Sequence, residues 1–587
     1  MLWMIRKGKK QWDFLNISGS VFHGILFLAF FSWPTPSISQ VEMVPVDHKV
    51  YSLLEDLSVK GIIDYNNSNI PLSRGAVGAY LKQLIGKREH LTLTENRILD
   101  DLLVEFSHDV GTDTGRSFNL LEDLPGGFGD IFDGKRQKYL MSYADSNFSL
   151  FLDGVGALSF MNYSSLSFPP THLMLGEIGP RLRGSFYNAL GYYIQITGGQ
   201  SLSGSAYARS VAARSNPILA ESSKFVREGF IDGFTGYVRL EGFNRNLALT
   251  VGRESFEMGN GYIDKIFVSD NIPPFDFVRM DMDYKFFRYG FFIGNLKGDS
   301  LGMPITSKLF IAHRLDVEMS RYFRFGLFES MIISNSPLSL TFLNPVSYIT
   351  SVDITTDVKA AGQDMNNGLI GLDCEAKPFR DVAIQCSFLI DDMNLSTLFK
   401  HDESNDANKF GYQAGIFYAQ PFGLKDLTAI LEYTRIDPYV YSHRTNESNY
   451  TNWGICIGAP LPPNSDQVAL RLDYYLTSQI TMGFVYRHQR SGEGFLDANG
   501  IPTLEDTGII TRNFGGDVNR GDLDTKYYNT FLQGLRINRE ILTLSSRIEP
   551  VRQYYFDVDY TLQYIENLFS SKTYIDQIFY VTAATDF

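Results

Sequence analysis

Eight polar residues with aromatic neighbours are the part of this sequence best suited to hold a ligand. The eight are Arg253, Glu254, Asp270, Asn271, Arg279, Arg435, Asp437 and His443. Phe275, Tyr439 and Tyr441 lie among them in the sequence. Planar polar groups can bond pairs of hydroxyls, aromatic rings can pack on C–H surfaces, and arginine adds bidentate recognition of carboxylates. This chemistry is compatible with a glycan site, although any one of these residues more often belongs to an internal Arg–Asp network.

Motifs for catalysis and metal binding are scarce. The sequence contains no Walker-type phosphate loop and no His-Glu-x-x-His motif. Asp391 and Asp392 form a carboxylate pair, but adjacent strand residues point to opposite faces and cannot flank one bond. The three cysteines form no metal-ligand set. We therefore expect a protein that is not an enzyme and has no cofactor and no metal.

The composition excludes several classes of protein. The chain has 587 residues, well above the roughly 150 of a typical domain. Its net charge of −14 argues against a nucleic-acid-binding protein. After residue 31 the sequence has no apolar run of the roughly 18 residues that a transmembrane helix needs. An aromatic content of 14% with 51 glycines instead indicates β-structure that faces an unusual solvent.

Residues 1–39 have the pattern of a secretory signal peptide. Basic residues lie between Arg6 and Lys10, an apolar segment runs from Val21 to Phe31, and Ser37-Ile38-Ser39 offers a small-x-small cleavage site. An uncleaved anchor is the alternative reading of this segment. Either way, the pattern predicts an exported protein.

Residues 40–124 are predicted to form an α-helical module, because apolar residues recur there with helical spacing. Asp47 can cap a first helix and Ser73 a second, while Thr92 and Glu95 match a capping box for a third. The glycine-rich residues 125–138 are read as a linker.

From residue 139 to residue 587 the hydrophobic period changes to two, which is typical of β-strands. A soluble β-sandwich also alternates in this way. A membrane barrel is favoured because the strands continue too long for one sandwich, the apolar face is rich in Phe and Tyr, and the chain ends in Phe587. At about 25 residues for each strand and its connection, we predict an all-β transmembrane barrel of about 18 antiparallel strands.

One predicted hairpin determines which faces of the strands meet lipid. Cys374 and Cys386 both fall on the apolar parity, whereas Asp373 and Glu375 fall on the other. A turn centred on Arg380 would pair the two cysteines in neighbouring strands. We therefore expect both thiols to face lipid, since a slip of one residue would turn every side chain to the other face.

One stretch of the chain carries a recognisable pattern: Gly252-Arg253-Glu254, Gly259-Asn260-Gly261, the run Ser269-Asp270-Asn271-Ile272-Pro273-Pro274-Phe275-Asp276, and Arg279. This pattern resembles the signature of the Wzi family of outer-membrane capsule assembly proteins. Weaker similarities occur at Tyr433-Thr434-Arg435-Ile436-Asp437-Pro438-Tyr439 and at Val46-Asp47-His48. The sequence departs from the family at Asn260, where a proline is expected.

The resemblance implies an 18-stranded barrel with a helical periplasmic module and a lectin-like, non-enzymatic role. The expected partners are capsular or extracellular polysaccharide, outer-membrane lipid and other envelope assembly proteins, with no nucleic acid. The expected location is the outer membrane of a Gram-negative-type bacterium, with the helices in the periplasm. A porin or channel for hydrophilic solutes is the alternative function, and an outer-membrane enzyme acting on lipid or glycan is a third.

Overall fold

The computed structural model describes most of residues 40–587. The described residues are 40–111, 117–123, 128–216, 219, 223–298, 307–334, 340–349, 366–393, 408–493, 495–496, 502–503, 514–519, 530–568 and 571–586. The signal peptide predicted for residues 1–39 lies outside them.

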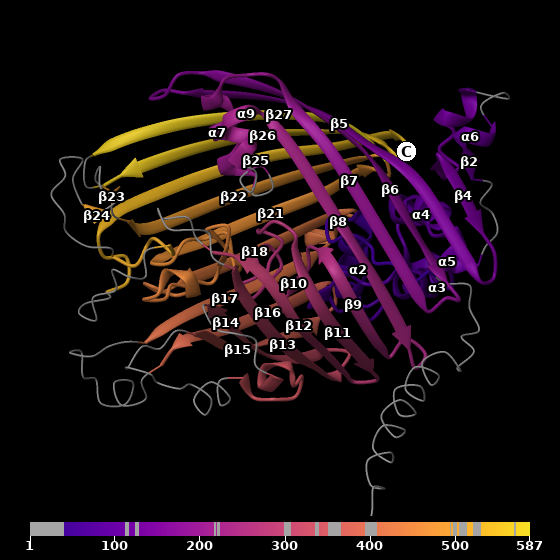
Figure 1. The fold of residues 1–587 in the computed structure, drawn as a ribbon, viewed down its shortest axis with the longest axis horizontal. Helices are drawn as coiled ribbons and strands as arrows, with labels where there is room; N and C mark the ends of the chain where they lie inside the picture. The colour runs from indigo at the N-terminus through magenta and orange to yellow at the C-terminus, as the bar shows by residue number, and fades with distance from the viewer. Residues whose placement is uncertain are drawn as a thin grey trace, which may run out of the picture.

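Antiparallel strands close into one barrel of 18 strands, as the sequence predicted (Figure 1). The last strand pairs with the first, and a short additional strand, β4 (Met141–Ala144), pairs with the beginning of β5. Because every edge is paired, the barrel has no free row of backbone donors and acceptors. The barrel strands are β5 (Phe148–Ser165), β6 (Thr171–Phe186), β7 (Leu190–Ser203), β8 (Phe230–Gly242), β9 (Leu247–Glu254), β11 (Phe275–Tyr284), β12 (Phe287–Lys297), β13 (Ser307–Ser320), β14 (Phe323–Ser334), β15 (Asn367–Phe379), β16 (Val382–Asp392), β17 (Lys409–Ala419), β18 (Leu427–Ile436), β21 (Ser465–Thr477), β22 (Ile480–Glu493), β25 (Leu535–Val551), β26 (Tyr554–Asn567) and β27 (Lys572–Asp586).

Strand register confirms the predicted hairpin of β15 and β16. Cys374 lies directly opposite Cys386. Leu372 and Ile384, on the same parity, are exposed on the outer face, whereas Asp373 and Gln385 are buried in the lumen. Both thiols therefore face outward, toward the position of the lipid. In the described part of the chain the helices are too short or too polar to cross a bilayer.

The N-terminal helices form a module with its own apolar core. Its main helices are α2 (Lys49–Val59), α3 (Arg74–Ile85) and α4 (Leu93–Glu105), followed by the short α5 (Ser107–Val110). Ser73 caps α3, and Thr92 with Glu95 forms the predicted capping box of α4. The prediction for α2 was wrong by one residue, because its N-cap is His48, whose ring accepts from Val50 N, and not Asp47. Leu53, Leu57, Leu81, Leu99 and Phe106 are among the fully buried residues of this core.

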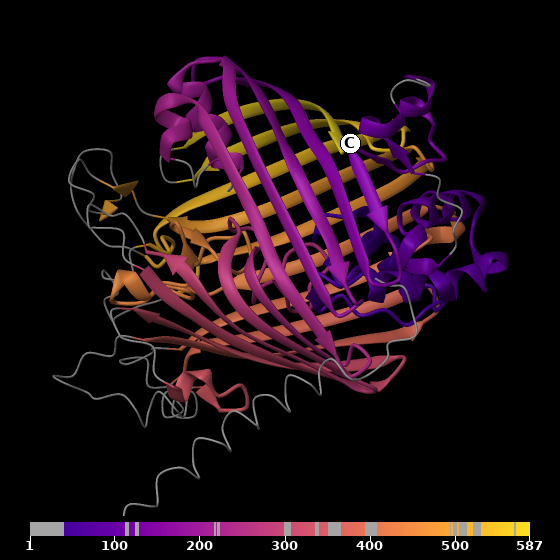
Figure 2. The same cartoon turned by 45° about the vertical axis from the view of Figure 1, so that its right-hand side comes forward.

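The module lies inside the end of the barrel where short turns join the strands, which we call the turn end (Figure 2). Arg324 Nη2 donates to Asp64 Oδ1 at 2.9 Å and Thr92 Oγ1 donates to Asp426 Oδ1 at 2.5 Å, so both contacts join the module to barrel residues near turns. Deeper in the lumen, Ser68 Oγ donates to Asp316 Oδ2 at 2.9 Å. These contacts are polar, unlike the module's interior, and they fix the module against one side of the barrel wall.

Two loops fill the lumen toward the opposite end, which we call the loop end. The inward loop (residues 255–274) includes β10 (Glu257–Met258), which pairs with β1 (Asn69–Ile70) of the module. The second loop (residues 437–464) packs on it: Tyr441 OH donates to Ile266 O at 2.6 Å and Tyr450 OH to Phe267 O at 3.0 Å. Phenylalanines of both the wall and the inward loop complete this apolar cluster.

A helical hairpin covers another part of the loop end. It consists of α7 (Ala206–Ser215) and α9 (Ser223–Glu228) between β7 and β8. Val211 and Phe225 pack with Met161 and Leu173, which face the interior of the barrel from β5 and β6. Module, loops and hairpin together therefore occupy both ends of the lumen.

Candidate functional site

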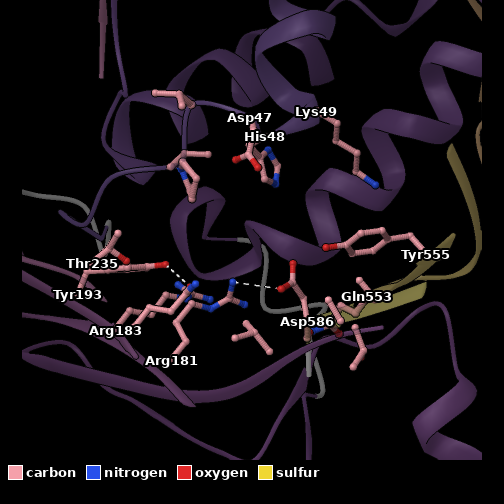
Figure 3. A pocket seen from close by; sticks show the side chains of 18 of the residues that line it. Asp47, His48, Lys49, Arg181, Arg183, Tyr193, Thr235, Gln553, Tyr555 and Asp586 are labelled. Carbon is pink, nitrogen blue, oxygen red and sulfur yellow. Dashed lines mark hydrogen bonds and ion pairs between the residues drawn. The ribbon is translucent and has the colours of Figure 1, made fainter. Parts of the chain in front are cut away.

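A cavity of about 570 Å³ lies in the lumen between the module and the wall formed by β5–β8 and β25–β27. Asp47, His48 and Lys49 of the module face Arg181, Arg183 and Asp586 of the wall across it (Figure 3). This size is within the range of roughly 300–1,000 Å³ usual for ligand pockets. The cavity is therefore the described part of the lumen best suited to hold a ligand.

Small residues of the wall create this space. Strand alternation directs Ala157, Thr197, Thr235 and Ala584 into the lumen, and all four line the cavity. Tyr193 and Tyr555 add aromatic surface, and the Tyr193 ring stacks on that of Tyr237 with centroids 5.3 Å apart. Such a lining offers both hydroxyl partners and C–H-binding surface.

Ion pairs hold most of the charged groups around the cavity. Arg181 Nε donates to Asp153 Oδ2 at 3.0 Å, and its Nη1 to Asp586 Oδ1 at 3.4 Å (Figure 3). Arg183 Nη1 donates to Glu42 Oε1 at 3.0 Å, which ties the start of the module to β6. Lys49 Nζ donates to Glu549 Oε2 at 2.6 Å. The charged side chains are therefore held in position before any ligand arrives.

Glu105 of α4 is kept ionised at the edge of the cavity. Burial alone would raise its pKa, but the charges of His48, Arg74 and Arg552 lower it well below the ordinary value. His48 Nε2 lies 3.0 Å from Glu105 Oε1. This pairing joins the beginning of α2 to the end of α4 and stabilises the module's inner surface.

A second cavity of about 280 Å³ lies between α2 and the inward loop. Glu55 and Asp270 line it, and Asp270 also lines the larger cavity. Burial raises the pKa of Glu55 to about 7. Its Oε1 accepts from Asn67 Nδ2 at 2.5 Å. This carboxyl is therefore near half-ionisation at neutral pH.

The other side of the barrel has a filled lumen. Arg314 is 1% exposed and bonds both Asp316 and Asp373, with Arg314 Nη1 donating to Asp373 Oδ2 at 2.6 Å. Asp373 in turn accepts from the backbone N of Asn260 at 3.2 Å, so the pair holds the inward loop. Glu432 accepts from three successive backbone N–H groups of the same loop, those of residues 262, 263 and 264.

The structure does not bring the eight sequence-predicted site residues together. Glu254 and Asp270 line the large cavity. Arg279 is buried, and its guanidinium donates to Asp281 Oδ1 at 2.9 Å and to Asn69 Oδ1 at 2.8 Å. Asn271 Nδ2 donates to Cys456 O at 3.1 Å. Arg279 thus ties the wall to the module, and Asn271 ties the two loops to each other.

The remaining four residues lie away from the cavity. Arg253 shares the outward parity of Val251 and lies 3.7 Å from Asp276, so its side chain points away from the cavity. Arg435 also faces outward, and its Nε donates to Asp437 Oδ1 at 2.8 Å. His443 lies in the second loop, where its Nδ1 accepts from Thr445 N at 3.1 Å.

Several residues that organise the lumen were missed from the sequence. They are Arg181, Arg183, Arg314, Glu432 and Arg552. One signal could have found the four that lie on strands: a charged residue on the polar parity of a barrel strand must point into the lumen. Arg552 lies in a turn, where alternation gives no such signal. The alternation already placed Asp373 on that parity, but its partner lies two strands away and alternation cannot identify it.

The closed barrel with a filled lumen defines the class of protein, a large outer-membrane β-barrel. The family model for the capsule assembly protein Wzi matches residues 197–519, more than half of the chain. The chain belongs to the Wzi capsule assembly family. A search of curated proteins finds no match.

One solved structure shows the same fold. The barrel is similar to Wzi of Escherichia coli, described as an outer membrane protein involved in group 1 capsule assembly and a carbohydrate-binding β-barrel; the TM-score is 0.53 at 13% identity, covering 92% of this chain and 98% of that one. OprD of Pseudomonas aeruginosa is less similar, with a TM-score of 0.41, 10% identity, and coverage of 74% and 95%. For OccAB4 of Acinetobacter baumannii the TM-score is 0.41 at 9% identity, covering 76% of this chain and 99% of that one.

Proposed function

We propose that this protein is a non-enzymatic outer-membrane protein that binds capsular or extracellular polysaccharide and retains it at the cell surface. Membership of the capsule assembly family supports this function. The observation that carries the proposal for the site is the 570 Å³ cavity with polar and tyrosine-bearing walls inside a barrel occupied at both ends. Carbohydrate binding by the similar E. coli barrel agrees with it.

The test compares a deletion strain with its parent and with a strain that carries the gene again on a plasmid. If the function is right, the deletion strain releases polysaccharide into the medium and the complemented strain retains it. Equal retention in the deletion strain and the parent would contradict the proposal. In vitro, the purified barrel should bind polysaccharide from the same strain, whereas dextran of similar length serves as the neutral control.

A passive channel for hydrophilic solutes is the second candidate, because the alternative use of a large barrel is an aqueous pore. The apolar cluster of the two loops and the helical module argue against it, since they occupy opposite ends of the lumen. The expected result in planar bilayers is therefore no steady conductance. Stable porin-like conductance of the wild-type protein would favour the channel.

The helical module is proposed to face the periplasm. It contacts residues next to the short turns, and such turns lie on the periplasmic side in outer-membrane barrels. The module would then be available to other envelope assembly proteins, while the outer face of the strands contacts lipid. Protease added to intact cells should leave residues 40–111 uncut, and cleavage there with an intact barrel would contradict this orientation.

Three of the sequence-predicted residues are proposed to act in this function. Glu254 and Asp270 would contact the glycan from the cavity wall, and Arg279 would keep the module seated through Asn69. Arg279→Ala should still insert into the membrane but lose polysaccharide retention or gain conductance. Arg435→Ala, on the outer face, is the matched control. A variant at Arg279 that retains polysaccharide and does not conduct would remove this residue from the site.

A further inference from the structure

Arg552, in the turn between β25 and β26, has an unusual hydrogen-bonding state. It lines the large cavity and is 6% exposed. Its Nη1 donates to the backbone O of Asp101 at 2.8 Å, but its Nε and Nη2 have no hydrogen-bond partner. Among the buried guanidinium groups that the structure describes, Arg279 and Arg536 each leave one nitrogen without a partner, and Arg552 leaves two. Buried donors without partners are costly, so their presence needs an explanation.

One acceptor of the same cavity is also without a partner. Gln137 is 8% exposed and its Oε1 has no hydrogen bond. Gln137 lines the cavity together with Arg552. An oxygen atom in this state can accept from a hydroxyl group of a ligand. One cavity therefore collects an unfilled donor pair and an unfilled acceptor.

The neighbouring Arg547 shows what the free edge of Arg552 can bind. Its Nε donates to Asp557 Oδ1 at 2.7 Å and its Nη2 to Asp557 Oδ2 at 2.9 Å. Nε–H and Nη2–H of a guanidinium are parallel, and their spacing matches the two oxygens of a carboxylate. In Arg552 the Nε and Nη2 of this edge have no hydrogen-bond partner. A carboxylate is therefore the group whose geometry fits it.

The local charge also favours an anion at this point. Lys138 is fully buried next to Arg552, and its Nζ donates to the backbone O of Arg552 at 3.1 Å. Burial and the charge of Arg552 lower the pKa of Lys138 to about 8. Arg552 Nη1 lies 3.9 Å from Glu105 Oε2, but the Oε1 of Glu105 pairs with His48, and Glu549 pairs with Lys49. Neither carboxylate bonds the Nε–Nη2 edge of Arg552. A ligand anion would stabilise both cations.

We propose that the turn end of the cavity is a subsite for a carboxylate-bearing sugar, a uronate unit of an acidic polysaccharide. The Nε–Nη2 edge of Arg552 binds the carboxylate, and Gln137 Oε1 accepts from a ring hydroxyl. This inference rests on the proposed function and gives its ligand a chemical class. In this subsite the Nε–Nη2 edge of Arg552 distinguishes acidic sugar units from neutral ones.

The test uses two probes that differ only in the group that Arg552 would recognise. Methyl β-D-glucuronide carries a carboxylate where methyl β-D-glucoside carries a hydroxymethyl group. Binding of each to the purified full-length barrel is measured by calorimetry or saturation-transfer NMR. We expect the wild-type protein to prefer the glucuronide by about tenfold, equivalent to about 1.4 kcal/mol.

Variants connect that preference to the residue. Arg552→Gln should reduce the preference to about one, and Arg552→Lys, which keeps the charge but not the parallel donors, should leave about two- to fivefold. Gln137→Met, which removes the acceptor Oε1, should weaken both probes by a similar factor and preserve the preference. Arg88→Gln removes an exposed arginine of the module, paired with Asp100, and should change nothing. Heat-modifiable gel mobility confirms that each variant is folded.

The outcomes separate this inference from the proposed function. If the wild-type protein binds both probes equally and Arg552→Gln changes neither affinity, the uronate subsite is wrong while glycan binding stands. If the wild-type protein binds neither probe nor the polysaccharide of its own strain, both are wrong. Should Arg552→Gln fail to insert, Arg552→Lys still decides, since an unchanged tenfold preference in Arg552→Lys would overturn the proposal.

Discussion

The two sides of the barrel use the same strand alternation for opposite purposes. On the side formed by β9–β21, inward charged residues such as Arg314, Asp373 and Glu432 are almost completely buried and bond to loops that enter the lumen. On the side formed by β25–β27 and β5–β8, small residues such as Ala157 and Thr235 leave a cavity. We call these the filled side and the open side.

Ion pairs therefore have a different structural role on each side of the barrel. On the filled side the ion pairs are removed from water and carry the loops, so the loss of one partner leaves a buried charge. On the open side they border the cavity; Arg547 keeps 48% of its side chain exposed. The first arrangement builds the plug, and the second arranges polar groups for a ligand.

The largest expected effect distinguishes the two sides directly. Arg314→Ala should lower the free energy of unfolding by about 3–5 kcal/mol, because Asp316 and Asp373 stay buried without their partner. Arg547→Ala, the matched change on the open side, should cost only about 0–1 kcal/mol. Urea unfolding in lipid vesicles, followed by tryptophan fluorescence, measures both. Equal losses would contradict the distinction between the sides.

A smaller effect is expected at the carboxylate that holds the inward loop. Glu432→Ala removes the acceptor of three backbone N–H groups and should cost about 1.5–3 kcal/mol. The loop should then become accessible to protease and the barrel should show intermittent conductance. Glu540→Ala, a carboxylate on the outer face that contacts His488, serves as control. An inward loop that stays protected without Glu432 would show that the apolar cluster alone holds it.

One substitution should remove the pH dependence that Glu55 gives to the stability of the module. Glu55 has a pKa of about 7 in the folded protein against an ordinary 4.5, so the folded state binds more protons and stability falls as pH rises between these values. Glu55→Gln should therefore make α2 more stable than in the wild type above pH 7, on the order of 1–3 kcal/mol, with no gain at pH 4.5 or below. Hydrogen–deuterium exchange of α2 amides measures this, and an equal gain at both pH values would contradict a titrating Glu55.

The smallest effect concerns the outer face of the filled side. Cys386→Ser should change the free energy of unfolding by less than about 0.5 kcal/mol, since an exposed position facing outward makes no internal contact. Cys386 should react with a lipid-soluble maleimide in vesicles, whereas the buried Cys456 should not. Labelling of Cys456 in preference to Cys386 would mean that the strand faces have been exchanged.

Much of the fold could be predicted, because it depends on local patterns. The alternation around Cys374 and Cys386 predicted a hairpin that the structure confirms, and Thr92 with Glu95 predicted a helix start. The α2 cap was assigned to Asp47 instead of His48, because both residues could accept the same backbone hydrogen bond. Whether a segment of this chain forms a helix or a strand depends on its local sequence, and so it could be predicted.

The candidate site was less predictable, because its members come from distant parts of the chain. Arg279 and Asn69 are 210 residues apart and bond through the lumen. The residues that resemble the Wzi family, between Gly252 and Arg279, lie in different environments. Arg253 faces outward, Arg279 is buried, and Asp270 lines both cavities. Sequence clustering therefore identified the region of the inward loop but not the cavity beside it.

The sequence by itself determined the barrel, the approximate number of strands, the faces of the strands and the presence of a helical module, because the period of the apolar residues encodes these features locally. Only the tertiary structure decided which inward charges pair with one another and where the lumen stays open. Those outcomes depend on how the module and the inward loop pack against the two sides of the wall. The unpaired edge of Arg552 follows from that packing, since Asp101 takes one of its nitrogens and no described group reaches the other two.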